Sequence, residues 1–343
     1  MTMAPLSPKE KSTEFSEKFQ SLLDERGRKA LEITREVISK EYTKIECKEV
    51  RGAIEYFMNK YWNDVMRPAL LSIVCEAVGG NPSSTVNLAI SSILIGGAID
   101  IHDDIIDESK VKYGRQTVYG KFGKDVALLV GNALLFKGLT ILGEIKELPE
   151  EKKGAIFKIL KDMFFELGDA EAMELRYRKC VIPSLSDYLK LLEKKAADVE
   201  AHARLAAIFG GASITEIEKL GRYGRLLGTL IIMRDDILDL LDDQELKSRI
   251  LKEHLPLPII CVCQDEGVKS KLFSLLQNGR ITKRKIKLIQ EFIEEKGGIV
   301  MSMKIMKKLA KEALSLLRQL RIKNKSQLRM LITFTLKIMD PSE

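Results

Sequence analysis

The stretch LAISSILIGGAIDIHDDIID, residues 88–107, is an apolar run that ends in four carboxylates. Asp100, Asp103, Asp104 and Asp107 are spaced by three and four residues, which places them on one face of a helix. They stand at the C-terminal end of that helix, where the macrodipole disfavours negative charge. Because like charges one turn apart cost about 0.2–0.5 kcal/mol per pair, we expect a cation to bind among them.

The rest of the chain predicts an all-α protein. Apolar residues recur every three or four positions in segments such as VALLVGNALLFKGLTILGEI (126–145), which is typical of helices. Ser184 or Ser186 is a candidate N-cap. Breaks between helices are expected at 79–84, 148–154, 181–186, 254–258 and 295–299. After a disordered tail over residues 1–13, we expect one domain over residues 14–343, a single bundle of ten or more helices around a central hydrophobic cavity.

Composition places the chain among globular proteins and limits the classes of partner that it is expected to bind. Apolar residues make up 45% of the 343 residues and charged residues 31%. The net charge is +7, and its basic residues, which are dense in the last quarter, are interpreted as solvated helix faces. No aromatic residues are interleaved for base stacking, so nucleic acid is not expected as a partner. Anionic phosphorylated substrates and peripheral contact with a membrane surface are both compatible with this charge.

Cysteine usage and the N-terminus predict the compartment. The five cysteines include no CxxC pair, which favours a reducing environment without disulfides or a zinc knuckle. The N-terminal residues MTMAPLSPKEKSTEF lack the apolar core of a signal peptide. No uninterrupted apolar run reaches the roughly 18 residues that a membrane span needs. We therefore expect a cytoplasmic protein with no integral membrane segment.

A second apolar helix ends in the same way as the first. The segment LLGTLIIMRDDILDLLDD (226–243) carries Asp235, Asp236 and Asp239 at the spacing of the first cluster. Carboxylates suit Mg²⁺, which also keeps water and substrate phosphate oxygens as ligands. Two such clusters facing each other across several Mg²⁺ ions would hold a diphosphate and stabilise its departure. Apolar helix walls would house a hydrocarbon chain and keep water from a carbocation.

At this point the sequence resembles a known family, the trans-isoprenyl diphosphate synthases or polyprenyl synthetases. The resemblance runs from about residue 50 to the C-terminus, through DDIID, RDDILD, RPALLSIVCEAVGGNP (67–82), YGKFGKDVALLVGNALL (119–135) and KKAADVEAHARLAAIFGG (194–211). It implies the class I terpenoid synthase fold, a homodimer, and ionisation of an allylic prenyl diphosphate with about three Mg²⁺ ions. The metal ligands that it implies are Asp103, Asp104, Asp107, Asp235, Asp236 and Asp239. The catalytic residues that it implies are Asp103, Asp104, Asp107, Asp235 and Lys195.

The resemblance also implies basic residues that bind diphosphate. Lys195 matches the family lysine that holds the allylic diphosphate, and Lys112 matches the first residue of an Arg-Arg pair with the same role. Arg67 matches the last arginine of the family's GKRxRP motif. The loop after the second acidic motif is shortened, and its basic residues either replace the family's diphosphate-binding lysines or form an exposed basic face. They are Lys247, Arg249 and Lys252.

This sequence departs from the family mainly at the positions with which family members bind isopentenyl diphosphate. GKRxRP reads NDVMRP, so its lysine is replaced by Asp64 and its first arginine by Val65. The second arginine of the Arg-Arg pair is Tyr113, and a family histidine or glutamine is Gly96. A charge-assisted contact to phosphate contributes about 1.5–3 kcal/mol, so losing two or three would weaken isopentenyl diphosphate binding by orders of magnitude. Compensation by other basic residues is the alternative.

The residues before the first cluster predict the pocket. Ala98 and Ile99 stand where the family often places bulky residues, with Gly96 further along the helix, and Ile232 replaces a glutamine near the second motif. Small residues leave room for a long substrate, about C15 or more. Each glycine inside a helix costs about 1 kcal/mol and so needs a reason. Close packing of Gly96 and Gly97 against another helix fits as well as pocket volume.

Three functions remain open from the sequence. The departures favour a terpene synthase-type enzyme, in which the cation cyclises, loses a proton or captures water without isopentenyl diphosphate. The alternative is a prenyltransferase that elongates the chain with isopentenyl diphosphate. A non-catalytic partner subunit is the third, against which two intact acidic motifs argue. The roles of Asp100 and of the acidic segment 168–175 stay open.

Overall fold

The computed structural model describes residues 8–112, 114–145, 149–178, 180–277, 281–320 and 324–339. The described chain is helical apart from one pair of two-residue strands, which confirms the predicted all-α fold. Its contacts group into two compact units, each assembled from separate stretches of sequence. The units are described in turn, and the single domain over residues 14–343 stays a prediction.

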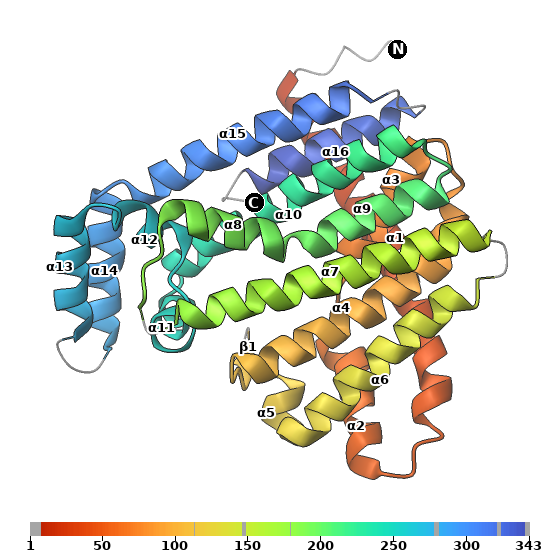
Figure 1. Ribbon diagram of the computed structural model, residues 1–343, viewed down its shortest axis with the longest axis horizontal. Helices are drawn as coiled ribbons and strands as arrows, with labels where there is room; N and C mark the ends of the chain where they lie inside the picture. Colours follow the sequence, from red (N-terminus) through yellow and green to blue (C-terminus); the bar gives the residue numbers. More distant parts are fainter. Residues whose placement is uncertain are drawn as a thin grey trace. The chain divides into compact units, whose positions relative to one another are not determined.

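Unit 1 comprises Met1–Gly154, Leu205–Ser213 and Ile322–Thr333. Its most extensive helix contact joins α4 and α6, which run side by side in Figure 1. α4 buries an almost continuous apolar surface and carries the first acidic cluster at its end. The elements of this unit are α1 (Pro8–Tyr42), α2 (Lys48–Tyr56), the π-helix η1 (Phe57–Tyr61), α3 (Met66–Ala77), the 3₁₀-helix η2 (Pro82–Thr85), α4 (Val86–Ile106), β1 (Val111–Lys112), β2 (Arg115–Gln116), α5 (Val118–Phe122) and α6 (Lys124–Gly143).

Unit 2 comprises Ala155–Arg204, Ile214–Arg321 and Phe334–Glu343. α10 carries the second acidic cluster and packs most extensively on α15 (Figure 1). The helices are α7 (Glu150–Arg176), α8 (Leu185–Lys195), α9 (Ala197–Phe209), α10 (Ile214–Leu241), α11 (Asp243–Lys252), α12 (Leu257–Val262), α13 (Glu266–Gln277), α14 (Lys283–Glu295), α15 (Gly298–Arg318) and α16 (Lys325–Ile338). α7, α9 and α16 contribute residues to both units.

The predicted helix boundaries mostly agree with the structure. α8 begins after Ser184, whose hydroxyl accepts a hydrogen bond from the Asp187 amide at 3.1 Å, so the predicted cap is confirmed. The N-terminal prediction is wrong in part, because α1 begins at Pro8 and residues 8–13 are helical rather than a disordered tail. Residues 1–7 of that predicted tail lie outside the described residues.

Two helices are long and apolar enough to cross a membrane by length and composition, Pro82–Ile106 and Lys124–Gly143. The expectation that the chain has no integral membrane segment stays a prediction, because core helices pass the same test of length and composition. The most apolar window of the first helix is 72% buried within the protein, as in a core helix, and that of the second is 33% buried. α6 thus presents an apolar face that its own unit does not cover.

Candidate active site

A short hairpin brings a lysine back to the first acidic cluster. After α4 ends, β1 and β2 pair antiparallel with Lys112 opposite Arg115. Gly114 turns the hairpin at a φ of 71°, which glycine adopts without strain. Thr117 fixes its base, because its hydroxyl donates to the Ser109 carbonyl at 2.7 Å and its amide to the Lys110 carbonyl at 3.1 Å. The hairpin therefore holds Lys112 in a defined place.

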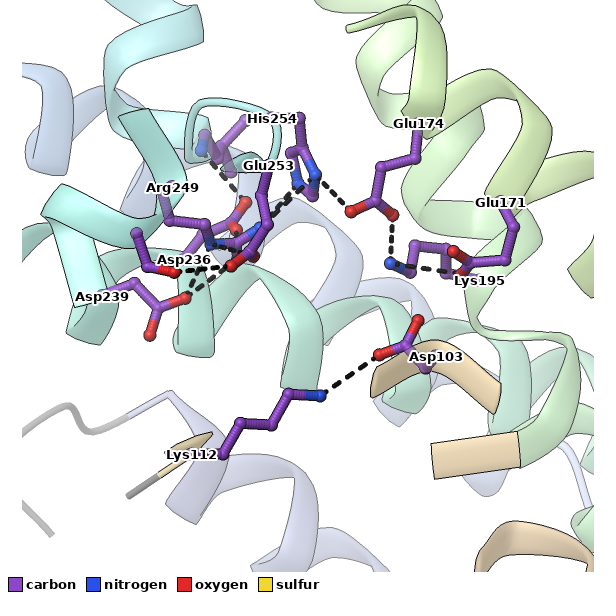
Figure 2. Close-up of polar contacts among 12 residues, drawn as sticks. Asp103, Lys112, Glu171, Glu174, Lys195, Asp236, Asp239, Arg249, Glu253 and His254 are labelled. Atoms are coloured by element: carbon purple, nitrogen blue, oxygen red, sulfur yellow. Dashed lines mark hydrogen bonds and ion pairs between the residues drawn. The ribbon is translucent and has the colours of Figure 1, made fainter. Parts of the chain in front are cut away.

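Lys112 is the cation that the crowded carboxylates require. Its Nζ lies 3.3 Å from Asp103 Oδ2 and 2.9 Å from Asp104 Oδ1, and Figure 2 shows it pointing at Asp103. Burial raises the pKa of Asp104 to about 7, although Lys112 acts in the opposite direction. Burial lowers the pKa of Lys112, but the carboxylates of Asp103, Asp100 and Asp104 more than reverse this and raise it.

The other two carboxylates belong to the same charged group. Asp107 is buried and ends α4, and its amide donates to the Asp103 carbonyl at 2.8 Å. Burial raises the pKa of Asp100 above its ordinary value, and the nearby Lys112 opposes this rise without cancelling it. Asp100, whose role the sequence left open, therefore shares the field of Lys112 with the motif residues.

The first cluster has the chemistry of a cation site. Carboxylate oxygens are hard ligands that suit Mg²⁺. Asp104 Oδ2 is buried, and no described residue donates a hydrogen bond to it. Within the described ranges no three His, Cys, Asp or Glu side chains converge as a preformed metal site. Although they are not gathered into a preformed site, Asp103, Asp104 and Asp107 fit a divalent cation because of their negative charge and because Asp104 Oδ2 accepts no hydrogen bond from a described residue.

Arg67, predicted to bind diphosphate, is paired with a residue of its own motif. Its Nη1 lies 2.9 Å from Asp64 Oδ2. Asp64 Oδ1 accepts from the amides of Met66 at 3.1 Å and Arg67 at 3.2 Å, so Asp64 caps the first turn of α3. The residue that replaces the family's lysine therefore neutralises the matching arginine and stabilises a helix start.

The two glycines before the first cluster have different surroundings. A Cβ on Gly97 would lie 2.7 Å from Phe57 Cε1, so Gly97 allows close packing of η1 on α4. A Cβ on Gly96 would meet Arg67 Cδ at an ordinary 3.6 Å. Trp62 stacks on Phe57 with ring centroids 5.3 Å apart. Of the other predicted pocket residues, Ala98 is fully buried, and Ile99 in unit 1 and Ile232 in unit 2 are half-buried.

We predict opposite effects on stability for these glycines. Gly97→Ala should lower the free energy of unfolding by about 1–3 kcal/mol, because the methyl group would overlap Phe57. Gly96→Ala should be neutral or stabilise by up to about 1 kcal/mol, through helix propensity. Urea unfolding followed by circular dichroism measures both. Equal effects of the two substitutions would contradict this account of the packing.

In the second cluster, Asp236 and Asp239 are already paired. Asp236 is completely buried, and its Oδ2 accepts from the Tyr188 hydroxyl at 2.7 Å and the Leu257 amide at 3.0 Å. Its Oδ1 lies 2.7 Å from Arg249 Nη2. Asp239 Oδ2 accepts from Arg249 Nε at 2.9 Å (Figure 2). The carboxylates of this cluster therefore have different environments.

Asp235 is the exposed carboxylate of the second cluster. Desolvation by the protein around it, followed by the charges of Asp239 and Asp236, raises its pKa to about 6. No described residue forms a hydrogen bond or ion pair with its side chain among the contacts of this cluster. Asp235 therefore remains available to a metal ion.

Lys195 is held by two acids of α7. Its Nζ contacts Glu174 Oε2 and lies 3.5 Å from Glu171 Oε1. Glu174 Oε1 lies 2.6 Å from His254 Nδ1, and Arg249 Nη1 lies 2.9 Å from His254 Nε2. Since arginine only donates, His254 accepts at Nε2 and donates from Nδ1 to Glu174. A continuous polar chain, visible in Figure 2, thus joins Lys195 to the second cluster.

Sequence reasoning missed three members of this chain, Glu174, His254 and Tyr188. The segment 168–175 was flagged without a partner, and in the structure it supplies Lys195 with both of its acids. The only sequence signal was the spacing of Glu171 and Glu174, which puts them on one helix face. His254 carried no signal, because it lies in a predicted break and acts through residues distant in sequence.

The three basic residues predicted in the shortened loop separate on α11. Lys247 and Lys252 are exposed, whereas the Arg249 side chain is 11% exposed and directed at the second cluster. The prediction left open whether all three bind diphosphate or form a basic face. Their different environments indicate that Arg249 has a separate role from the two lysines.

Comparison with known proteins agrees with this arrangement. The polyprenyl synthetase family model matches residues 47–293. A geranylgeranyl diphosphate synthase of Methanosarcina mazei is 30% identical over 213 residues, which cover 61% of this chain and 65% of that protein. A short chain isoprenyl diphosphate synthase of Methanothermobacter thermautotrophicus is 28% identical over 237 residues, which cover 67% of this chain and 71% of that protein. The match thus spans just under two thirds of the length of the first relative.

Solved structures show the same fold. A geranylgeranyl pyrophosphate synthetase from Pyrococcus horikoshii matches with a TM-score of 0.81 and 24% identity, over 94% of this chain and 99% of that chain. A polyprenyl synthetase from Streptomyces coelicolor matches with a TM-score of 0.80 and 20% identity, over 93% and 99%. Because the family model covers most of the chain, including both acidic clusters and Lys195, this all-α chain belongs to the polyprenyl synthetase family.

Proposed function

We propose that the chain is a trans-prenyl diphosphate synthase, which ionises an allylic prenyl diphosphate and joins it to isopentenyl diphosphate. The observation that carries this proposal is the first acidic cluster, in which Asp104 and Asp107 are buried and Lys112 pairs with Asp103 and Asp104. Similarity to synthases of geranylgeranyl and short-chain diphosphates supports elongation over the terpene synthase-type reading that the sequence favoured. The length of the chain that is elongated stays a prediction of about C15 or more.

The site residues supply the charge that this reaction needs. Within unit 1, Asp103, Asp104 and Asp107 would hold Mg²⁺, the metal on which the family generally depends, and within unit 2 Asp235 would do so. When bound, Mg²⁺ would stabilise the negative charge of the departing diphosphate. Lys112 neutralises the carboxylates of Asp103 and Asp104, and it would be available to pair with a diphosphate oxygen when Mg²⁺ takes over that role. In unit 2, Lys195 is a second diphosphate-binding candidate, oriented by Glu174.

One observation favours ionisation without isopentenyl diphosphate as a second candidate. Arg67 is the basic residue of the GKRxRP segment that this chain keeps, and Asp64 neutralises it at 2.9 Å. An arginine that is paired with a carboxylate offers less attraction to a second diphosphate than an unpaired one. The prenyl cation would then cyclise, lose a proton or capture water.

Labelled isopentenyl diphosphate distinguishes the two candidates. The protein would be incubated with Mg²⁺, radiolabelled isopentenyl diphosphate and geranyl, farnesyl, geranylgeranyl or geranylfarnesyl diphosphate. Elongation predicts label in a longer prenyl diphosphate. A hydrocarbon or alcohol product without label would contradict elongation and support the second candidate. Asp64→Lys should raise incorporation, because it removes the carboxylate that pairs with Arg67 and adds a cation.

We also propose a homodimer, with the exposed face of α6 as its interface. Leu128, Leu129 and Phe136 are 46%, 56% and 71% exposed and lie on one side of the helix. A second copy would bury the same residues against themselves, as a twofold interface does. The cytoplasmic location stays a proposal, which the five unpaired thiols support.

We predict that Phe136→Glu dissociates this dimer. A charge on the apolar face should weaken self-association at least about 100-fold, because burying a carboxylate without a partner is costly. Val300→Glu, at an apolar residue of α15 that is 58% exposed, is the matched control. Sedimentation velocity measures both. A wild-type monomer, or an equally dimeric Phe136→Glu variant, would contradict the proposed interface.

A further inference from the structure

The exposed side of α15 (blue in Figure 1) carries a stripe of basic residues. These residues recur every three, four or seven positions, which keeps them on one side of the helix. The other side of α15 is buried in its unit through residues such as Met306, Ala310 and Leu317, so the stripe faces solvent. The basic stripe consists of Lys304, Lys307, Lys308, Lys311 and Arg318.

The charge of the basic stripe is not neutralised within the described part of the chain. None of the described ion pairs joins its four lysines to a carboxylate. Glu312, the one acid of α15, lies at the margin of the stripe and pairs with Arg222 of α10 at 3.0 Å. Exposed lysines on other helices of unit 2 do have acidic partners, as Lys158 has in Asp162 at 3.2 Å. The stripe therefore presents a concentrated positive charge to solvent.

Exposed apolar residues extend the basic stripe at the N-terminal end of α15. Val300 is 58% exposed and Met301 is 39% exposed. Val300 precedes Lys304 by four residues and so lies on the same side of the helix. Apolar side chains beside lysines suit the boundary of a lipid bilayer, where the apolar groups insert and the lysines reach lipid phosphates. A single-stranded nucleic acid would instead stack its bases on aromatic rings, and α15 has none.

We propose that the basic stripe binds the protein to an anionic phospholipid membrane, with Val300 and Met301 inserted at the edge of the acyl chains. Clusters of about four to eight Lys and Arg residues on an amphipathic helix are typical of binding to anionic lipids. The inference goes beyond the proposed synthase function and does not depend on it. It would place an enzyme with a hydrocarbon product at the phase in which that product dissolves.

Co-sedimentation of the full chain with vesicles tests this inference without any prenyl substrate. Vesicles of equal parts phosphatidylcholine and phosphatidylglycerol would be compared with vesicles of phosphatidylcholine alone. The stripe variant carries Lys304→Gln, Lys307→Gln, Lys308→Gln and Lys311→Gln. The control variant loses the same charge from exposed faces of α7 and α14, through Lys158→Gln, Lys161→Gln, Lys283→Gln and Lys287→Gln.

We expect the wild-type protein to bind the anionic vesicles at least about tenfold more tightly than the neutral ones, and less tightly as salt is added. The stripe variant should lose at least about 100-fold in affinity for anionic vesicles, and the control variant less than about threefold. Val300→Ser leaves the charge unchanged and should weaken binding by about threefold or more, because it removes an inserted apolar group. Lys→Arg substitution at the four stripe positions keeps the charge and should preserve binding.

Three outcomes would overturn the proposal. Equal losses in the stripe and control variants would show that net charge, and not α15, governs binding. Vesicle binding that is unchanged in the stripe variant, with its circular dichroism spectrum preserved, would place the contact elsewhere. Absence of wild-type binding to anionic vesicles, together with binding of a single-stranded RNA oligonucleotide that the stripe variant loses, would make nucleic acid the partner of this face.

Discussion

Asp103→Ala is expected to reduce diphosphate release from an allylic prenyl diphosphate by at least about 10³-fold. Losing one preorganised charge contact at a departing anion typically costs 10²–10³ in rate, and Asp103 is also a proposed metal ligand. Removing it leaves Lys112 paired with Asp104, which favours the metal-free state. Release of diphosphate at saturating Mg²⁺ measures the effect.

The matched control is Asp162→Asn. Asp162 is an exposed carboxylate of α7 that pairs with Lys158 at 3.2 Å, far in sequence from both motifs. Its loss should leave the rate within about twofold, since exposed ion pairs contribute little. Equal rates for Asp103→Ala and wild type would show that the first cluster does not serve ionisation.

Glu174→Gln is expected to lower the free energy of unfolding by about 3–5 kcal/mol. Glu174 is almost completely buried between Lys195 and His254, and removing one charge of a buried pair leaves the other uncompensated. Glu171→Gln is the matched control, because Glu171 is more exposed and lies 3.5 Å from the same lysine. Its effect should be about 1 kcal/mol or less. Urea unfolding at neutral pH measures both variants.

The same pair predicts a dependence on pH. Although burial raises the pKa of Glu174, Lys195 and His254 hold it well below its usual 4.5. A carboxyl whose pKa is depressed on folding adds stability above its unfolded pKa and loses it as the pH falls through the folded value. The difference between wild type and Glu174→Gln should therefore be constant above about pH 5.5 and shrink below 4.5. A difference that grows on acidification would contradict this.

Much of the fold could be predicted because its signals are local. The periodicity of segments such as 126–145 and the break before Ser184 follow from residues close in sequence, and both are confirmed. The start of α1 at Pro8 was missed because residues 8–13, PKEKST, contain no apolar side chain apart from the proline. The exposed face of α6 was also missed, because an apolar helix gives no indication of which face its own unit covers.

The sequence predicted which charged side chains form the candidate site, but not which residues each of them pairs with. The crowded carboxylates at the end of α4 predicted a nearby cation, and Lys112 is that cation. The sequence did not predict the hairpin that carries Lys112, because its two strands have only two residues each. Gly97 could not be assigned to packing or to pocket volume until Phe57 was located against it. Arg249 and His254 take their roles from residues far away in sequence, and spacing along one helix contains no information about them.

The measurement that tests the central claim most directly is release of diphosphate. The wild-type protein would receive each of the four allylic prenyl diphosphates with isopentenyl diphosphate, in the presence of Mg²⁺ or of a chelator. We expect release from at least one substrate, dependent on Mg²⁺ and lost on chelation. Folded protein that releases no diphosphate from any of the four in Mg²⁺ would contradict the claim that the acidic clusters ionise a prenyl diphosphate.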